Sequence, residues 1–111
     1  MKTYPAGAHT LGELVHASLA IGREPFAVPG APDKAETLNA FAAALDFPAW
    51  FGGNLDALND CLGDWASALT VPATLVWERS ATLDAGTAAA VESILGDAEA
   101  GSPHLSVIVL G

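Results

Sequence analysis

Residues 47–65 read FPAWFGGNLDALNDCLGDW and form the most distinctive segment of a 111-residue chain. An aromatic pair and two glycines lead into a stretch with leucines at helical spacing, and Asn54 is placed to cap its first turn. The leucines that share one face of this predicted helix are Leu55, Leu58 and Leu62. The aspartates that share the other face, at i, i+4 and i+8, are Asp56, Asp60 and Asp64. The segment therefore predicts an amphipathic helix with an acidic outer face, held in place by the rest of the chain.

The composition describes a single folded domain with a strongly acidic surface. With 111 residues and 51% hydrophobic side chains, the chain can bury a core without disulfides. It has 13 acidic residues against 4 basic ones, which gives a formal net charge of −9. Such a surface repels phosphate backbones, so nucleic acids and anionic membranes are poor partners. A basic protein is the partner that this charge favours.

The cysteine content and the apolar runs predict a soluble, cytoplasmic protein. Cys61 is the only cysteine, so no intramolecular disulfide and no cysteine-based zinc site can form. A single thiol fits a reducing compartment. Glu13 and His16 interrupt the apolar run near the N-terminus, unlike the core of a signal peptide. The longest uncharged run, within residues 65–77, contains Pro72 and is too short to span a bilayer.

Helical and strand patterns alternate along the chain. Residues 1–9 show no periodicity and are expected to be irregular, whereas Thr10 and Glu13 have the spacing of a capping box that begins a helix over 11–20. The apolar residues that recur at helical spacing in this helix, and so predict its inner face, are Leu11, Leu14, Val15 and Leu19. The further elements expected are a weak strand over 25–30, a helix capped by Asp33 with Leu38, Phe41 and Leu45 inward, a helical turn over 65–69, a strand over 71–78, a long helix capped by Thr82 or Asp84, and a strand over 105–110. Helices that separate apolar strands predict an α/β fold with a small parallel sheet covered by helices.

The acidic helix face has more than one interpretation. The simplest is a solvated outer face without a partner. The three aspartates could also offer oxygen ligands to Ca²⁺ or Mg²⁺, but a rigid i, i+4 spacing does not wrap an ion and no EF-hand pattern is present. We favour a protein-binding face, because the aspartates have no Lys or Arg beside them and are flanked by Trp50, Phe51 and Trp65 as anchors.

Catalytic interpretations have less support. A two-carboxylate hydrolase needs an acid with a raised pKa and a substrate cleft, and the sequence indicates neither. Gly52-Gly53 precedes a helix, but no P-loop lysine follows. Cys61 would need a base to act as a nucleophile, and none of the three histidines (His9, His16 and His104) is near it in the sequence. A buried structural thiol is the simpler interpretation, and we predict no enzymatic activity, cofactor or metal.

Residues 50–62, WFGGNLDALNDCL, resemble the signature of the barstar family, the intracellular inhibitors of the bacterial ribonuclease barnase. The resemblance extends from about Phe26 to the C-terminus. It implies a three-stranded parallel sheet packed with helices, to which this chain adds an N-terminal helix. We therefore divide the chain into an N-terminal extension over residues 1–22 and a barstar-like domain over residues 23–111.

The resemblance also implies which residues bind the partner. In that family the helix and the loop before it plug the active site of the nuclease, and the aspartate that matches Asp60 imitates a substrate phosphate. The other residues that this matching places in the interface are Trp50, Gly53, Asn54, Asp56 and Trp65. We also expect Asn59, Asp64 and Asp97 to contact the partner. These three positions depart from the family prototype: Asn59 replaces a tryptophan, Asp64 a glycine and Asp97 a glutamate.

Charge and resemblance together predict an immunity protein or antitoxin that inhibits a basic bacterial ribonuclease of the barnase class, or a toxin nuclease domain. The departures indicate that this nuclease is not barnase itself. The alternative is a regulatory module of barstar fold that uses the same face to bind a basic partner that is not a nuclease.

Overall fold

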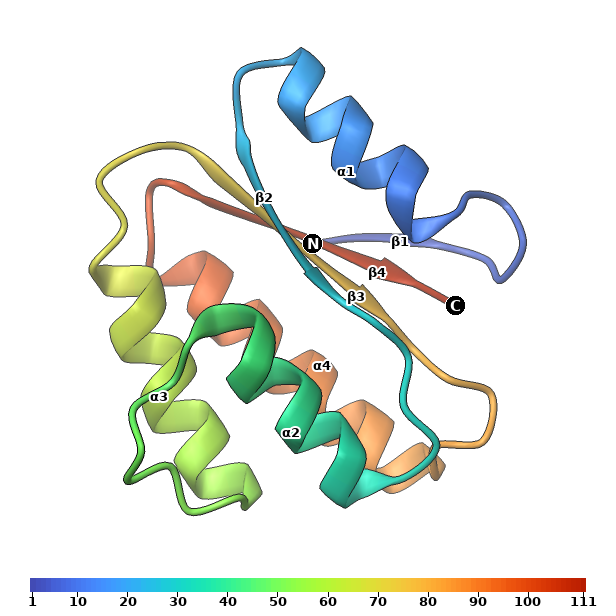
Figure 1. Cartoon of the computed structure of the whole chain (residues 1–111), viewed down its shortest axis with the longest axis vertical. Helices are drawn as coiled ribbons and strands as arrows, with labels where there is room; N and C mark the ends of the chain where they lie inside the picture. The colour runs from blue at the N-terminus through green and yellow to red at the C-terminus, as the bar shows by residue number, and fades with distance from the viewer.

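The computed structural model describes residues 1–111 as one four-stranded parallel sheet with four helices (Figure 1). The strands are β1 (Lys2–Tyr4), β2 (Glu24–Val28), β3 (Ala73–Glu78) and β4 (Leu105–Leu110). The helices are α1 (Leu11–Ala20), α2 (Lys34–Leu45), α3 (Leu55–Ser67) and α4 (Ala85–Ala100). All pairs of neighbouring strands are parallel, so the predicted α/β class is confirmed.

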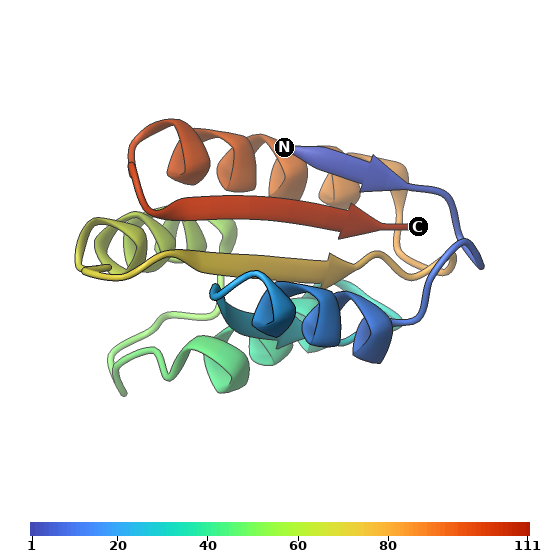
Figure 2. The same cartoon turned by 90° about the horizontal axis from the view of Figure 1, so that it is seen from above.

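The sheet separates α1 from the other three helices (Figure 1). The strands lie in the order β1-β4-β3-β2, so the chain moves in one direction from β2 to β4 but in the opposite direction from β1 to β2. Because crossovers between parallel strands are right-handed, α2, α3 and α4 cover one face and α1 covers the other. Figure 2 shows β1, β4 and β3 side by side, with α1 over the β2 edge of the sheet.

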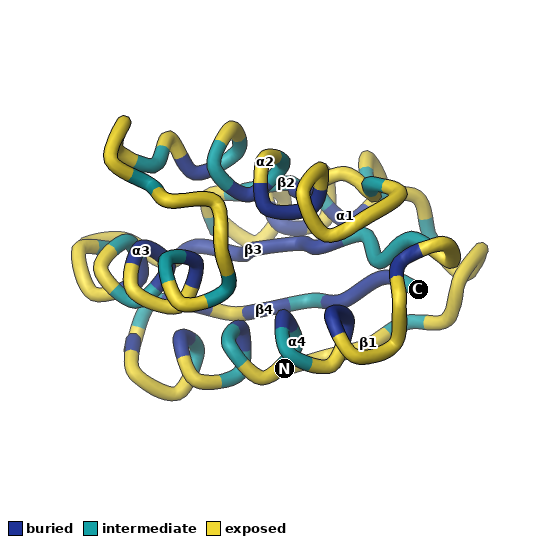
Figure 3. The backbone as a smooth tube through the Cα atoms, turned by 90° about the horizontal axis from the view of Figure 1, so that it is seen from below, coloured by how far each residue is buried: buried dark blue, intermediate teal, exposed yellow.

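The main core lies between the sheet and the helices α2, α3 and α4. Its two largest fully buried side chains, Phe41 and Trp77, have ring centroids 6.0 Å apart. β3 is buried along most of its length, since helices lie over both of its faces (Figure 3). Leu58 and Leu62 of α3 join this core with no exposed surface, as predicted. Their burial fixes the rotation of α3 about its own axis and therefore the side that faces solvent.

The expectation of a three-stranded sheet is wrong, because a fourth strand lies at the β4 edge. β1 pairs with β4, with Lys2 opposite Ile108 and Tyr4 opposite Leu110. Residues 1–9 are therefore not irregular throughout. β1 has only three residues and no apolar alternation, so it pairs through backbone hydrogen bonds to a strand at the other end of the chain and through the packing of Tyr4 against Leu14, Val76 and Leu110.

The predicted helix starts are confirmed. Thr10 Oγ1 accepts a hydrogen bond from the Glu13 amide at 3.1 Å, and Glu13 Oε1 accepts one from the Thr10 amide at 3.0 Å, which completes the capping box of α1. Asp33 caps α2, and Asp84 rather than Thr82 caps α4.

Two details of the helices differ from the prediction. The helical turn expected over residues 65–69 is the end of α3, which continues to Ser67 without a break. Leu19, expected on the inner face of α1, is 58% exposed because α1 covers only part of its side of the sheet. None of the four helices combines the length and the hydropathy needed to cross a bilayer.

Candidate partner-binding site

The N-terminus of α3 is fixed by two residues. Asn54 Oδ1 accepts a hydrogen bond from the Ala57 amide at 2.7 Å, which is the N-cap interaction predicted from the sequence. Gly53 precedes it with φ of +67°, a left-handed conformation that would strain any residue with a Cβ atom. Together they set the direction in which the preceding loop enters the helix.

The loop between α2 and α3 is anchored by two aromatic rings and exposes a third. Phe47 and Phe51 pack against the main core, with their ring centroids 5.2 Å apart. Trp50 lies between them in the sequence but is 66% exposed. A large apolar side chain held in solvent by a fixed backbone loses little conformational entropy on binding, so Trp50 is suited to anchor a partner.

Asp60 lies at the centre of the exposed side of α3. Each helical residue turns by about 100°, and with Leu58 and Leu62 in the core this rotation points Asp60 directly away from it. Asp56 and Asp64 lie on either side of Asp60, and all three aspartates are exposed.

No positive charge in the chain neutralises these carboxylates. The molecule has two ion pairs, between the Met1 ammonium and Glu99 and between Arg79 and Glu92, and neither involves α3. Burial, together with the negative charges of Asp64 and Asp60, raises the pKa of the Cys61 thiol. A buried, protonated thiol is a poor nucleophile, so the environment of Cys61 is that of a structural residue.

Two shallow hollows border α3, one on each side of Asp60. The first, of about 240 Å³, lies against the α2–α3 loop and is lined in part by Trp50, Asp64 and Trp65. Trp65 is half-buried and packs edge-on against Phe26 of β2, with ring centroids 5.0 Å apart and planes at 82°. This contact fixes the Trp65 ring as one wall of the hollow.

The second hollow, of about 180 Å³, lies between α3 and α4. Asn59 and Gly63 contribute to its α3 side, and Asp97 contributes to its α4 side. Glu99, two residues further along α4, does not reach this surface. Its carboxylate accepts a hydrogen bond from the Val107 amide at 2.6 Å, at the opposite edge of the helix.

The residues predicted to bind a partner thus lie on one continuous surface, which we call the α3 surface. It consists of Trp50, Gly53, Asn54, Asp56, Asn59, Asp60, Asp64, Trp65 and Asp97. The sequence did not indicate the hollows themselves. Asp46 and Pro48 also line the first hollow, and Ser67 and Ile94 also line the second. Each hollow forms only when helices that are separate in the sequence pack together.

The α3 surface has no arrangement suited to a metal. No group of three or more His, Cys, Asp or Glu side chains anywhere in the chain is placed to hold a metal ion. The aspartates of α3 follow one ridge of a helix, so their oxygens do not surround a common point. Their chemistry is that of an exposed anionic surface.

Fold and surface together define a small acidic α/β protein that presents a charged, aromatic-edged helix on a rigid scaffold. A family model described as Barstar (barnase inhibitor) matches residues 26–106. The chain therefore belongs to the barstar family, whose members are inhibitors rather than enzymes. The match begins in β2 and ends in β4, so it includes the α3 surface and leaves out β1 and α1. Comparison with curated protein sequences gives no match.

Proposed function

We propose that this protein is an immunity protein or antitoxin that inhibits a basic ribonuclease of the barnase class, or a toxin nuclease domain, by covering its active site with the α3 surface. Membership of a family of barnase inhibitors supports this function. The observation that carries the proposal is the row of three exposed aspartates on α3 without a cation beside them. An uncompensated row of this kind is mildly unfavourable within the helix, and a basic partner would offset that cost.

In this proposal Asp60 takes the place of a substrate phosphate. A ribonuclease holds the phosphate of its substrate with cationic side chains, and a carboxylate can accept the same charge-assisted hydrogen bonds. Asp60 is the aspartate that points most directly outward from α3, so it would enter a concave active site furthest. Asp56 and Asp64 would then meet cations at the rim.

The two hollows beside Asp60 would set the specificity for one nuclease. Trp50 and Trp65 offer aromatic faces beside Asp64, an arrangement suited to an arginine or lysine that contacts both a ring and a carboxylate. Asn59 and Asp97 offer a smaller, polar hollow on the other side. Because Asn59, Asp64 and Asp97 are the positions that depart from the family prototype, we expect the cognate nuclease to differ from barnase at the residues facing them.

The test is a titration of the full chain against a panel of purified barnase-class ribonucleases and toxin nuclease domains, with RNA cleavage as the readout. The proposal predicts that at least one of them is inhibited with a sharp one-to-one equivalence point. Absence of inhibition across the panel would contradict the proposal and favour the regulatory module that binds a basic partner other than a nuclease. The alternative would then be established if the wild-type protein bound such a partner through the α3 surface in a pull-down.

A further inference from the structure

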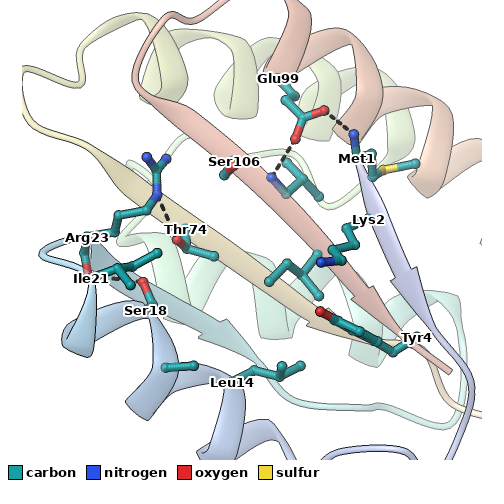
Figure 4. A pocket seen from close by; sticks show the side chains of 13 residues that line it. Met1, Lys2, Tyr4, Leu14, Ser18, Ile21, Arg23, Thr74, Glu99 and Ser106 are labelled. Carbon is teal, nitrogen blue, oxygen red and sulfur yellow. Dashed lines mark hydrogen bonds and ion pairs between the residues drawn. The ribbon is translucent and has the colours of Figure 1, made fainter.

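The largest hollow of the molecule lies on the opposite face of the sheet from the α3 surface. It is a groove of about 460 Å³ between α1 and β1, and we call it the α1 groove (Figure 4). α1 and β1 form its two walls, and Thr74 of β3 and Ser106 and Ile108 of β4 contribute to its floor. Its volume is within the range of small-molecule sites in proteins, about 300–1,000 Å³.

Positive charge is concentrated at this groove. The chain has only 4 lysines and arginines, and two of them, Lys2 and Arg23, line it from opposite sides (Figure 4). In a protein with a net charge of −9, this is the one hollow with two cationic side chains in its lining. Neither Lys2 nor Arg23 forms an ion pair.

The guanidinium of Arg23 is held in place with part of its donor capacity unused. Nε donates to Thr74 Oγ1 at 3.1 Å, and Nη2 donates to the carbonyl oxygens of Ala73 at 2.7 Å and His104 at 2.9 Å. Nη1 makes no hydrogen bond within the protein. A cation fixed by three hydrogen bonds, with one NH₂ group free, is preorganised to bind an anion because little side-chain entropy remains to be lost.

The other polar groups of the groove leave this positive charge available. The Lys2 ammonium lies 5.3 Å from the centroid of the Tyr4 ring and has no carboxylate partner. Glu99 is the only acidic side chain in the lining. One of its oxygens accepts from the Met1 ammonium at 2.5 Å and the other from the Val107 amide at 2.6 Å, so Glu99 is already neutralised locally.

The space between the two cations is bordered by apolar side chains. Leu14 of α1 and Ile21, the C-cap residue of that helix, form one side, and Ile108 of β4 lies on the floor. Ile21 is 73% exposed, which leaves a branched apolar side chain in water in the same groove as the Arg23 guanidinium. An occupant with an apolar body would cover this surface, and an anionic end would satisfy Arg23.

We propose that the α1 groove binds a small organic carboxylate with an aliphatic or aromatic body. The carboxylate lies between Arg23 and Lys2, and the body covers Leu14, Ile21 and Ile108. A singly charged head group matches this lining, because Nη1 is the one part of the Arg23 guanidinium without a partner in the protein. The site does not depend on the proposed inhibition of a nuclease, since the sheet lies between the α1 groove and the α3 surface.

Titration of the ¹⁵N-labelled full chain with octanoate, followed by ¹H–¹⁵N NMR, tests this site. Saturable shifts are expected at the amides of Arg23, Thr74, Ser106 and Ile108, without shifts in α3. Octanamide has the same apolar body without the charge and is expected to bind at least tenfold more weakly. Equal binding of octanoate and octanamide, or an absence of shifts in the groove, would overturn the proposal. The proposal would also be overturned if an acidic apolar peptide bound in the groove and octanoate did not.

The variants form a matched pair. Lys2→Gln and Lys34→Gln each remove one exposed ammonium, but Lys34 is at the start of α2, outside the groove. The expected result is at least threefold weaker octanoate binding in Lys2→Gln and no change in Lys34→Gln. Equal effects of the two variants would overturn the assignment. Arg23→Gln is expected to abolish binding, but Lys2→Gln is the decisive variant because Arg23 also ties β3 and β4 together through Ala73 and His104.

Discussion

The rings of Phe47 and Phe51 lie 5.2 Å apart, centroid to centroid, and pack against the main core from the loop between α2 and α3. This pair holds the backbone on both sides of Trp50, whose own ring is left in solvent. The three aromatic residues are close together in the sequence, but in the folded loop they have two different roles. Phe47 and Phe51 stabilise the fold, and Trp50 is available to a partner.

Replacement of Trp50 by alanine should weaken binding and leave stability unchanged. The ring makes few contacts within the protein, so the free energy of unfolding should change by less than about 0.5 kcal/mol. Binding to the inhibited nuclease should weaken by about tenfold or more, as for an aromatic anchor. Trp65→Ala is the comparison, because the loss of its contact with Phe26 should cost about 1–3 kcal/mol of stability as well. Equal destabilisation by the two variants, measured by urea unfolding, would contradict this division.

Two glycines of the α3 segment should respond to alanine with opposite signs. Gly53 has φ of +67°, so Gly53→Ala should destabilise the protein by about 1–2 kcal/mol. Gly63 lies within α3, and a methyl group at its Cα would have no atom within 4 Å apart from its two neighbours and the backbone of its own helix. Gly63→Ala should therefore stabilise the protein by about 0.5–1 kcal/mol through helix propensity. Urea unfolding of the two variants measures both effects. Changes of the same sign would show that the backbone at one of these positions differs from the structure.

The rate of association with the nuclease should fall as salt is added. A protein of net charge −9 with its exposed aspartates on the binding face attracts a basic partner over distances that salt screens. Stopped-flow measurements between about 0.05 and 0.5 M NaCl should show the association rate constant falling by roughly tenfold or more, with a smaller change in dissociation. Barnase and its own inhibitor are the standard example of such electrostatic steering, so the size of the expected salt effect is taken from that class of complex. An association rate independent of salt would contradict a role for the charge.

The acid sensitivity of the fold should depend in part on Asp84. Its carboxylate accepts a hydrogen bond from the Thr87 amide at 2.8 Å at the start of α4, and this bond lowers the pKa of Asp84 below its ordinary value of 3.8. The stabilisation is complete above that ordinary value and is lost as the pH falls through the lower pKa of the folded state. Asp84→Asn keeps an N-cap acceptor but does not titrate. The Tm advantage of the wild type over this variant should therefore shrink between pH 6 and pH 3, whereas parallel Tm curves would contradict the assignment.

The parts of the fold that the sequence predicted are those with a strong local signal. α3 has both an apolar stripe and an N-cap residue, so its start and its buried face follow from neighbouring residues alone. β4 is an apolar run bounded by turn residues, and its observed bounds, Leu105–Leu110, are those predicted. β1 has neither kind of signal. It exists because β4 offers an unpaired edge, which is a property of the folded sheet and not of residues 2–4.

The binding role of the candidate site residues stays a prediction, and the shape of the surface that they form could not be predicted from the sequence. The signature identified the aspartates and the tryptophans, and helical geometry placed Asp60 outward. The sequence could not show that Trp50 is exposed while Trp65 is half-buried, since both are tryptophans within the same apolar context. That distinction comes from tertiary contacts, because Phe26 of β2 packs against Trp65, whereas Phe47 and Phe51 pack against each other and leave Trp50 exposed.

The most direct test of the account is the affinity of the inhibited nuclease for two charge-matched variants, Asp60→Asn and Glu24→Gln. Each replaces one exposed carboxylate by an amide of similar shape, but Glu24 begins β2, away from the α3 surface. Phosphate mimicry by Asp60 predicts a Kd at least a hundredfold higher for Asp60→Asn, about 2.8 kcal/mol, with a change below twofold for Glu24→Gln. Equal, small losses in the two variants would contradict it, because only net charge, and not the position of Asp60, would then contribute to binding.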